Sequence, residues 1–451
     1  MIKKTKDKKI LDILEKIKKE ITPDIEIIKN IDSFVDKLNS YFKSKNLKIK
    51  CIKGGSIAKG TFLKDDFDVD LFIKFDYSYK NENISSILEK SLLEQKIKYE
   101  KIHGSRDYFI VKFSIKDKNL TFEENHFSKK ILCYELVPVL DIKNPEKAIN
   151  VTDMSPLHVS WVKKNLKKGQ EDEIRLAKKF CKGINVYGAE SYINGFSGHV
   201  IDILIIYYGS FLKLLKESIK WKPKVIIDPE KHFKSKDDVL FNLNKAKTTG
   251  PLIIVDPILK YRNAAASLSY EKFNLFIEKA KEFLENPSED YFKEKSIQEI
   301  INEKIKEQNK ITIVEMKIID QDLKKERYKE ILYAKILKTH NYLKDELIKK
   351  GFKIVDSNWG TSVNQKELII TLFYISENLE LKSEKLIKGP MLNMKEHVER
   401  FKNKYIKTYV KDDCIYAIAK INKVKITDNI KEIFNKSYYK KYFIITGIKT
   451  I

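Results

Sequence analysis

Cysteine, long apolar runs and arginine are the three features that this 451-residue sequence has little of. Its 4 cysteines are scattered, without CxxC or Cys/His spacing, so a structural zinc site is not expected. They are typical of small core residues in a reducing compartment, which makes the cytoplasm the expected location. No run of about 18 apolar residues occurs, so a membrane span or membrane partner is not expected. The N-terminal stretch MIKKTKDKKILDILEK lacks an apolar signal core and predicts an amphipathic helix. The cysteines are Cys51, Cys133, Cys181 and Cys414.

Arginine is scarce although the chain is strongly basic, with 88 Lys plus Arg and a formal net charge of +24. Such an excess of positive charge indicates a polyanionic partner, although lysine is spread so widely that part of it belongs to a solvated surface. Because the planar guanidinium binds bases and phosphates in ways that lysine cannot reproduce, the few arginines are candidates for special roles. They are Arg106, Arg175, Arg262, Arg327 and Arg400.

The segment GGSIAKGT (54–61) follows an apolar stretch that predicts a strand, and it resembles a phosphate-binding turn. Glycines allow the backbone to approach a phosphate, since no Cβ intervenes. A short helix is expected from Ser56 onward, and the N-terminus of a helix attracts anions. A glycine turn alone is weak evidence, because most such turns only connect two elements.

Two carboxylates follow this turn on the next predicted strand, residues 67–75. Asp68 and Asp70 are two residues apart, so their side chains point to the same face of that strand. A pair of this kind can hold two Mg²⁺ ions about 3.5–4 Å apart for in-line displacement at phosphorus. Asp-x-Asp alone is usually a solvated strand face. The glycine turn and the carboxylate pair together, in this order, favour nucleotidyl transfer.

The length of the chain predicts about three domains. We expect an α/β head over residues 1–151, a helical neck over 152–256, and a body and tail over 257–451. Within the neck, residues 199–215 are almost uninterruptedly apolar and predict one buried helix. In the body, residues 310–376 predict a β-α-β-β module.

The head motif resembles the polymerase-β-like nucleotidyltransferase superfamily, and later segments are similar to archaeal (class I) CCA-adding enzymes, which are tRNA nucleotidyltransferases. The resemblance implies a multidomain α+β protein whose head has a mixed sheet with helices. It also implies addition of C, C and A to the 3′ end of tRNA from CTP and ATP, with two Mg²⁺ ions and release of pyrophosphate. The strings that carry it are SPLHVSWVKKNL (155–166), RLAKKFCKGINVYGAE (175–190), NGFSGHVIDILIIYYGSF (194–211), VDPILKYRNAAASLS (255–269) and KGPMLNMKEHVERFKNKY (388–405).

The resemblance also implies roles for the head residues. Gly55 and Ser56 would contact the triphosphate, and Lys59 stands where the family usually has arginine. Asp68 and Asp70 would bind the metal ions. The third carboxylate of the family corresponds to Glu135 in the string ELVP, with Asp141 as the fallback.

The resemblance places four residues of the neck, and Arg262 shortly after it, around the nucleotide. Lys178 would bind phosphate, Tyr187 would reach the ribose or γ-phosphate, and Arg262 would select the base. Ordinary alternatives exist: His158 as a hydrogen-bonded core histidine, Tyr187 as a core tyrosine, and Arg262 in a salt bridge. The five residues are Ser155, His158, Lys178, Tyr187 and Arg262.

Two other functions stay open for the sequence. One is a different template-independent RNA nucleotidyltransferase, such as a poly(A) polymerase-like enzyme, and the other is a catalytically inactive RNA-binding relative. Acidic residues at all three carboxylate positions argue against the second. tRNA is the expected partner through its acceptor stem and 3′ end, and a homodimer is left open.

Overall fold

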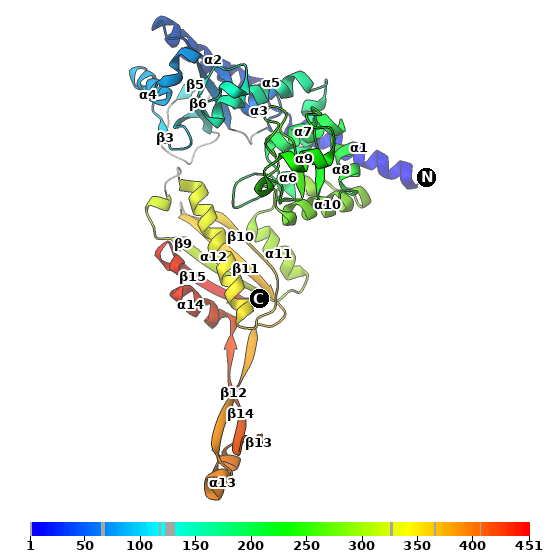
Figure 1. The fold of residues 1–451 in the computed structure, drawn as a ribbon, viewed down its shortest axis with the longest axis vertical. Helices are drawn as coiled ribbons and strands as arrows, with labels where there is room; N and C mark the ends of the chain where they lie inside the picture. Colours follow the sequence, from blue (N-terminus) through cyan, green and yellow to red (C-terminus); the bar gives the residue numbers. More distant parts are fainter. Residues whose placement is uncertain are drawn as a thin grey trace. The chain divides into compact units, whose positions relative to one another are not determined.

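The computed structural model describes residues 2–64, 68–116, 119–121, 131–324, 328–364, 367–405 and 407–451. Arg327 therefore lies outside the described residues, as does Phe67 at the start of one predicted strand. The chain divides into two compact units, Met1–Glu294 and Lys295–Ile451 (Figure 1). The domain boundaries proposed at residues 151 and 256 both fall within the first unit.

A mixed sheet forms the first part of unit 1, with strand order β1-β2-β6-β4-β3 and β5 paired to β4. β2 is parallel to β6 and antiparallel to β1. Alternation along β2 directs Val69, Leu71, Ile73 and Phe75 into the core, as the sequence predicts. The strands are β1 (Ile49–Lys53), β2 (Val69–Phe75), β3 (Glu100–Ile102), β4 (Tyr108–Lys116), β5 (Asn119–Thr121) and β6 (Ile131–Leu140).

Helices pack on this sheet through an apolar stripe. In α2 (Ile25–Ser44), the stripe recurs at helical spacing and places Phe34 against Phe113 and Tyr134, with ring centroids 5.0 and 4.9 Å away. α4 (Ile84–Glu94) contributes Leu88 and Leu92 to the same core. The glycine turn leads from β1 into α3 (Gly55–Lys59), which packs against β2.

The rest of unit 1 is mainly helical and is built around a second core. Phe180 lies at the centre of an aromatic group, with Phe211 at 5.4 Å and Phe283 at 5.8 Å between ring centroids. Two short parallel strands, β7 (Val225–Ile227) and β8 (Leu252–Ile254), complete it. The helices are α1 (Ile2–Ile21), α5 (Ser155–Asn165), α6 (Gln170–Gly183), α7 (Gly198–Tyr208), α8 (Phe211–Ser218), α9 (Lys236–Asn242) and α10 (Tyr270–Glu285).

The single helix predicted over residues 199–215 is wrong, because the structure has α7 and α8 there, bent by 91°. Gly209 ends α7 with φ +94°, a left-handed conformation that glycine adopts without strain. Ser210 begins α8 by accepting a hydrogen bond from the amide of Lys213. The dipeptide Gly209-Ser210 is the sequence signal for this break, and the apolar residues on both sides of it masked that signal.

The starts of α2 and α5 both adjoin another helical element. Asp24 is the N-cap residue of α2, and the Thr22 hydroxyl donates to the carbonyl of Lys18 at the end of α1. Ser155 is the first helical residue of α5, because a 3₁₀ turn over Val151–Met154 runs directly into that helix.

Unit 2 contains a four-stranded sheet of order β10-β11-β9-β15 with helices on both faces (Figure 1). One face of β9 packs Val314 and Met316 into the core that α12 and α14 share, while the other packs Ile311 and Ile313 against Ile297 of α11. Its main elements are α11 (Ile297–Lys306), β9 (Ile311–Ile318), α12 (Lys329–Lys349), β10 (Ile354–Asn364), β11 (Glu367–Ser376), α14 (Ile426–Lys436) and β15 (Phe443–Thr450).

Residues 311–376 thus run strand, helix, strand, strand, in the order that the sequence predicts. A smaller sheet of order β12-β14-β13 extends from this module. It contains β12 (Glu380–Met391), α13 (Lys395–Lys404), β13 (Thr408–Lys411) and β14 (Cys414–Lys425).

Within the described residues, no single helix is both long and apolar enough to cross a membrane. α7 and α8 meet that criterion only when they are counted together across their bend.

Candidate active site

The glycine turn after β1 fits closely against β2. The amide of Gly54 donates to the carbonyl of Asp70 at 2.7 Å, which ties the turn to the carboxylate-bearing strand. Gly55 has φ +47°, and a Cβ at this position would lie 1.6 Å from Oδ2 of Asp70. Only glycine therefore fits between α3 and the carboxylate. Ser56, the next residue, lies half-buried in the first turn of α3.

The parallel pairing of β2 and β6 brings two carboxylates side by side. Asp70 is directly opposite Glu135 in the register, so both side chains emerge on the same face of the sheet. Asp68 is exposed just before β2, two residues from Asp70. Burial, with the negative charge of Asp68 adding to it, raises the pKa of Asp70 to about 6, while Lys59 and Lys178 oppose the rise. A cation at this position would relieve the repulsion between these carboxylates.

Asp141, the fallback for the third carboxylate, lies elsewhere. Its amide donates to the carbonyl of Phe75, at the opposite end of β2 from Asp70. Phe75 is five steps along the strand from Asp70, a distance of about 16 Å. The Asp141 side chain is 51% exposed, and its carboxylate pairs with Lys74 at 2.6 Å. The geometry therefore favours Glu135 over Asp141 as the partner of Asp70.

A buried aspartate on α7 holds the two lysines of the predicted nucleotide site. Oδ2 of Asp202 is 2.5 Å from Nζ of Lys59, and its Oδ1 is 4.0 Å from Nζ of Lys178. Lys178 also donates to the carbonyl and hydroxyl oxygens of Thr61, at 3.0 and 3.1 Å. Burial lowers the pKa of Lys178 to about 8, although the charge of Asp202 counteracts this effect. The structure therefore brings α3, α6 and α7 together around two positive charges.

Tyr187 reaches the same region. A Cβ placed on Gly198, the first residue of α7, would lie 3.1 Å from the Tyr187 hydroxyl and 3.9 Å from Nζ of Lys178. The hydroxyl and the ammonium group thus converge on the N-terminus of α7, whose cap is Ser197. A helix N-terminus beside a lysine and a tyrosine hydroxyl suits an anion.

Asp256, which follows β8, joins two of the predicted nucleotide residues. Nε2 of His158 lies 2.9 and 3.0 Å from its two carboxylate oxygens, and Nη1 of Arg262 donates to Oδ2 at 3.0 Å. The carboxylate also accepts from the amides of Ile258 and Leu259. Burial alone would raise its pKa, but the hydrogen bond and charge of His158, with the backbone donors, lower it to about 2.

The ordinary alternatives, a hydrogen-bonded histidine for His158 and a salt bridge for Arg262, are therefore both present as contacts. Each residue has a carboxylate partner, yet the Arg262 side chain stays 47% exposed and can still meet a ligand. His158 lies on α5, which packs against α3, and Ser155 is half-buried one turn earlier on the same helix.

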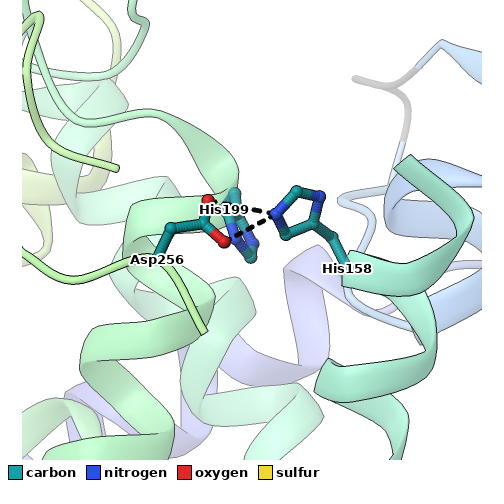
Figure 2. Close-up of side chains that lie close together, drawn as sticks. All are labelled: His158, His199 and Asp256. Carbon is teal, nitrogen blue, oxygen red and sulfur yellow. Dashed lines mark hydrogen bonds and ion pairs between the residues drawn. The ribbon is translucent and has the colours of Figure 1, made fainter. Parts of the chain in front are cut away.

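His199 lies beside this pair, and Figure 2 shows it converging with His158 and Asp256 from separate segments of the chain. The two imidazole rings are 4.6 Å apart between centroids, at 67°. Both ring nitrogens of His199 are buried without a hydrogen-bond partner in the described residues. Burial, with the charge of His158 acting in the same direction, lowers the pKa of His199 to about 3, so the ring is neutral at pH 7.

The sequence argument overlooked Asp202, Asp256 and His199. A usable signal existed for the first two, because an aspartate inside an apolar helix or after an apolar strand is rarely buried without a partner. Asp202 lies in the run HVIDILII and Asp256 follows LIIV, and both are fully buried.

Comparisons with known proteins identify similar domains and relatives. Residues 35–158 match the family "Nucleotidyltransferase domain" and residues 172–293 match "tRNA nucleotidyltransferase, second domain". The CCA-adding enzyme of Nanoarchaeum equitans is 35% identical over 90% of this chain and 95% of its own length. That of Methanocaldococcus jannaschii is 29% identical over 94% and 91%. A solved structure of the Cid1 poly(U) polymerase covers 63% of this chain and 98% of its own, with 15% identity and a TM-score of 0.48. The predicted fold class, a multidomain α+β protein with a nucleotidyltransferase head, is confirmed.

Proposed function

The chain belongs to the family of CCA-adding enzymes, which are tRNA nucleotidyltransferases, and on that basis we propose how its residues carry out the reaction. The proposed reaction adds C, C and A to the 3′ end of tRNA from CTP and ATP and releases pyrophosphate. The observation that carries the proposal is the pairing of Asp70 with Glu135 beside the glycine turn, with Asp68 two residues away.

The three carboxylates fit a site for divalent cations. Their oxygens are the ligands that Mg²⁺ prefers. Burial and, second to it, the charge of Asp68 raise the pKa of Asp70, and a bound cation would favour its ionised form. Asp68, Asp70 and Glu135 would hold two Mg²⁺ ions. When bound, such ions polarise the phosphoryl oxygens and neutralise charge that develops during displacement at phosphorus.

The basic residues of unit 1 would hold the triphosphate. Lys59 and Lys178 present their ammonium groups from α3 and α6, and Asp202 fixes the position of Lys59. Tyr187 would donate a hydrogen bond from its hydroxyl near the N-terminus of α7. These groups orient the nucleotide for attack by the tRNA 3′-hydroxyl, and such positioning supplies much of the rate.

The base and the remaining phosphate contacts would come from α5 and the segment after β8. Arg262 is half exposed and anchored by Asp256, so its free guanidinium nitrogens can donate to the base. Ser155 and His158 lie on α5, and Gly55 and Ser56 lie on α3, which packs against it.

The proposal is tested with purified protein, Mg²⁺, CTP, ATP and a tRNA that lacks its 3′ CCA, with products resolved at single-nucleotide length. We expect addition of C, C and A followed by a stop. Asp70→Asn and Glu135→Gln should reduce the rate at least about 1,000-fold, since a charge contributed at the reacting centre is lost. Asp141→Asn is the matched control and should stay within about 3-fold, because it removes only an exposed ion pair.

Other outcomes would redirect the assignment. A long A tail would favour a poly(A) polymerase-like enzyme. No extension by wild-type protein that still binds tRNA would favour an inactive RNA-binding relative. Equal losses in Asp141→Asn and Glu135→Gln would contradict the choice of third carboxylate.

A further inference from the structure

A second group of potential metal ligands comes from other elements than the three carboxylates proposed to bind Mg²⁺. His158 is on α5, His199 is on α7, and Asp256 follows β8. One ligand atom from each residue lies within 4.8 Å of the others, and Figure 2 shows the side chains directed toward a common point. Two imidazoles and a carboxylate are a ligand set typical of zinc, whereas Mg²⁺ prefers oxygen ligands.

Contacts within the protein do not account for His199. Its two ring nitrogens are buried and have no hydrogen-bond partner in the described part of the chain. A buried imidazole without partners loses the hydrogen bonds that it made to water in the unfolded chain. A bound metal ion would take the lone pair of one of these nitrogens.

Asp256 is held in the orientation that a ligating carboxylate needs. It accepts hydrogen bonds from the amides of Ile258 and Leu259 and from Arg262, which together fix the plane of the carboxylate. Supporting bonds of this kind orient the ligands in known metal sites. Nε2 of His158 already approaches the carboxylate to 2.9 Å. Two ligands of a tetrahedral zinc ion are about 3.4 Å apart, so small side-chain rotations would admit the ion.

We propose that His158, His199 and Asp256 bind one zinc-class ion, with a fourth coordination position open to water. This site differs from the one proposed for Asp68, Asp70 and Glu135. Those three carboxylates lie on or directly before the paired strands β2 and β6, and they offer only oxygen ligands.

Full-length protein, stripped with a chelator and kept in excess Mg²⁺, is titrated with Co²⁺ while the visible absorption of the ion is recorded. Wild-type protein should bind one equivalent. His199→Gln and His158→Gln should each weaken binding at least about 10-fold, because each removes a ligand. The matched control is His103→Gln, since His103 also contacts an aspartate, Asp107, at 3.0 Å, but without a second histidine in the described residues. It should bind like wild type.

Thermal unfolding provides a measurement that does not depend on the spectrum. Zn²⁺ should raise the melting temperature of wild type and His103→Gln, because an ion that binds only the folded chain stabilises it. It should leave that of the other two variants unchanged. If His199→Gln does not fold, His158→Gln carries the comparison. Equal Co²⁺ affinity in wild type and in a folded His199→Gln or His158→Gln protein would overturn the proposal, as would absence of binding to wild type.

Occupancy of this site has a consequence that rests on the proposed function. An ion on His158 would prevent that ring from contacting the triphosphate, so Zn²⁺ should weaken CTP binding to wild type but not to His199→Gln. CTP also chelates Zn²⁺, and the variant corrects for that. If Co²⁺ binds as expected but Zn²⁺ does not change the CTP affinity of wild type, the metal site is supported and the nucleotide role of His158 is contradicted.

Discussion

At the residue scale, the few arginines show how well amino-acid composition predicts the role of a side chain. Its scarcity suggested contacts to bases or phosphates, yet Arg106 bonds to Asp153 and to the carbonyl of Pro138, and Arg175 bonds to Asp172 and the carbonyl of Gly60. Both are structural, because a guanidinium can satisfy several acceptors in a fixed plane. Among the arginines that the structure describes, only Arg262 combines a carboxylate partner with an exposed side chain, and a sequence alone does not distinguish these situations.

Gly55→Ala tests the fit of the turn against Asp70. A Cβ would lie 1.6 Å from the carboxylate, so either the turn or Asp70 must move, and kcat/KM should fall at least about 100-fold. Gly169→Ala is the matched control, since Gly169 has φ +87° but nothing within 4 Å of its Cβ position. It should cost only about 1 kcal/mol of stability, measured by urea unfolding. Similar kcat/KM values for the two variants would contradict the steric argument.

Lys178 makes a pH-dependent prediction. Its pKa of about 8 means that its charge is lost between pH 7 and 9, so CTP affinity should fall about 10-fold over this range. Lys178→Arg keeps its charge and should show a flat profile in the same binding titration.

Lys178 should make the stability of the fold change with pH in the opposite direction to CTP affinity. Because the folded pKa of Lys178 is below the unfolded value, the unfolded chain binds more protons between about pH 8 and 10.4, and this group raises the free energy of unfolding with pH. If the CTP affinity of wild type did not change between pH 7 and 9, Lys178 would not contact the triphosphate through its charge.

At the scale of elements, periodic apolar patterns predicted strands and helices, whereas the break between α7 and α8 was not predicted. Alternation in β2 was predicted because burial repeats at the period of a strand. The parallel pairing that sets Asp70 opposite Glu135 joins residues distant in sequence, so local pattern could not reveal it. The resemblance to the family led to Glu135, and the strand register then distinguished it from Asp141.

The bend between α7 and α8 depends on two residues with separable effects. Gly209→Ala should destabilise the protein by about 1 kcal/mol, since alanine is strained at φ +94° although its Cβ would have room. Ser210→Ala should cost about 1 kcal/mol through loss of the cap on α8. Urea unfolding measures both. A stabilising Gly209→Ala would indicate that the two helices can merge into one.

Asp153 joins the end of the sheet to the start of α5. It is fully buried, pairs with Arg106, and accepts from the amides of Leu140 and Asn150 at 2.9 and 3.0 Å. Burial opposes ionisation, but these donors lower its pKa. Asp153→Asn should therefore cost about 3 kcal/mol at pH 7.

The same linkage fixes the pH dependence of that cost. An aspartate with a lowered folded pKa stabilises above its unfolded pKa of about 3.9, and this stabilisation is lost as pH falls through the folded value. The difference between wild type and Asp153→Asn in urea unfolding should shrink in acid. A constant difference would mean that the substitution acts through packing.

At the scale of the whole molecule, the residues proposed for chemistry all lie in unit 1, while unit 2 has its own cores. An exposed aromatic and basic group in unit 2 suits RNA, since Tyr438 is 62% exposed and Nζ of Lys441 lies 3.5 Å from its ring centroid. Lys441→Glu should weaken tRNA binding and reduce its salt dependence, while CTP binding stays unchanged. Filter binding at several salt concentrations measures this.

Lys436→Glu is the control for that comparison. Lys436 already pairs with Glu432 at 2.6 Å, so much of its charge is compensated and the loss of tRNA affinity should be smaller. Equal loss of CTP and tRNA binding in Lys441→Glu would refute the division of labour between the two units.

The grouping of these residues before Glu294 also bears on the order of events during protein synthesis. The ribosome releases the carboxylates, both lysines, Tyr187 and the pair His158–Asp256 before it makes the first strand of unit 2. The growing polypeptide can therefore assemble the proposed nucleotide site before the surface proposed to bind RNA in unit 2 exists. Nascent chains would compete for the cell's CTP and ATP before they could engage tRNA through both units.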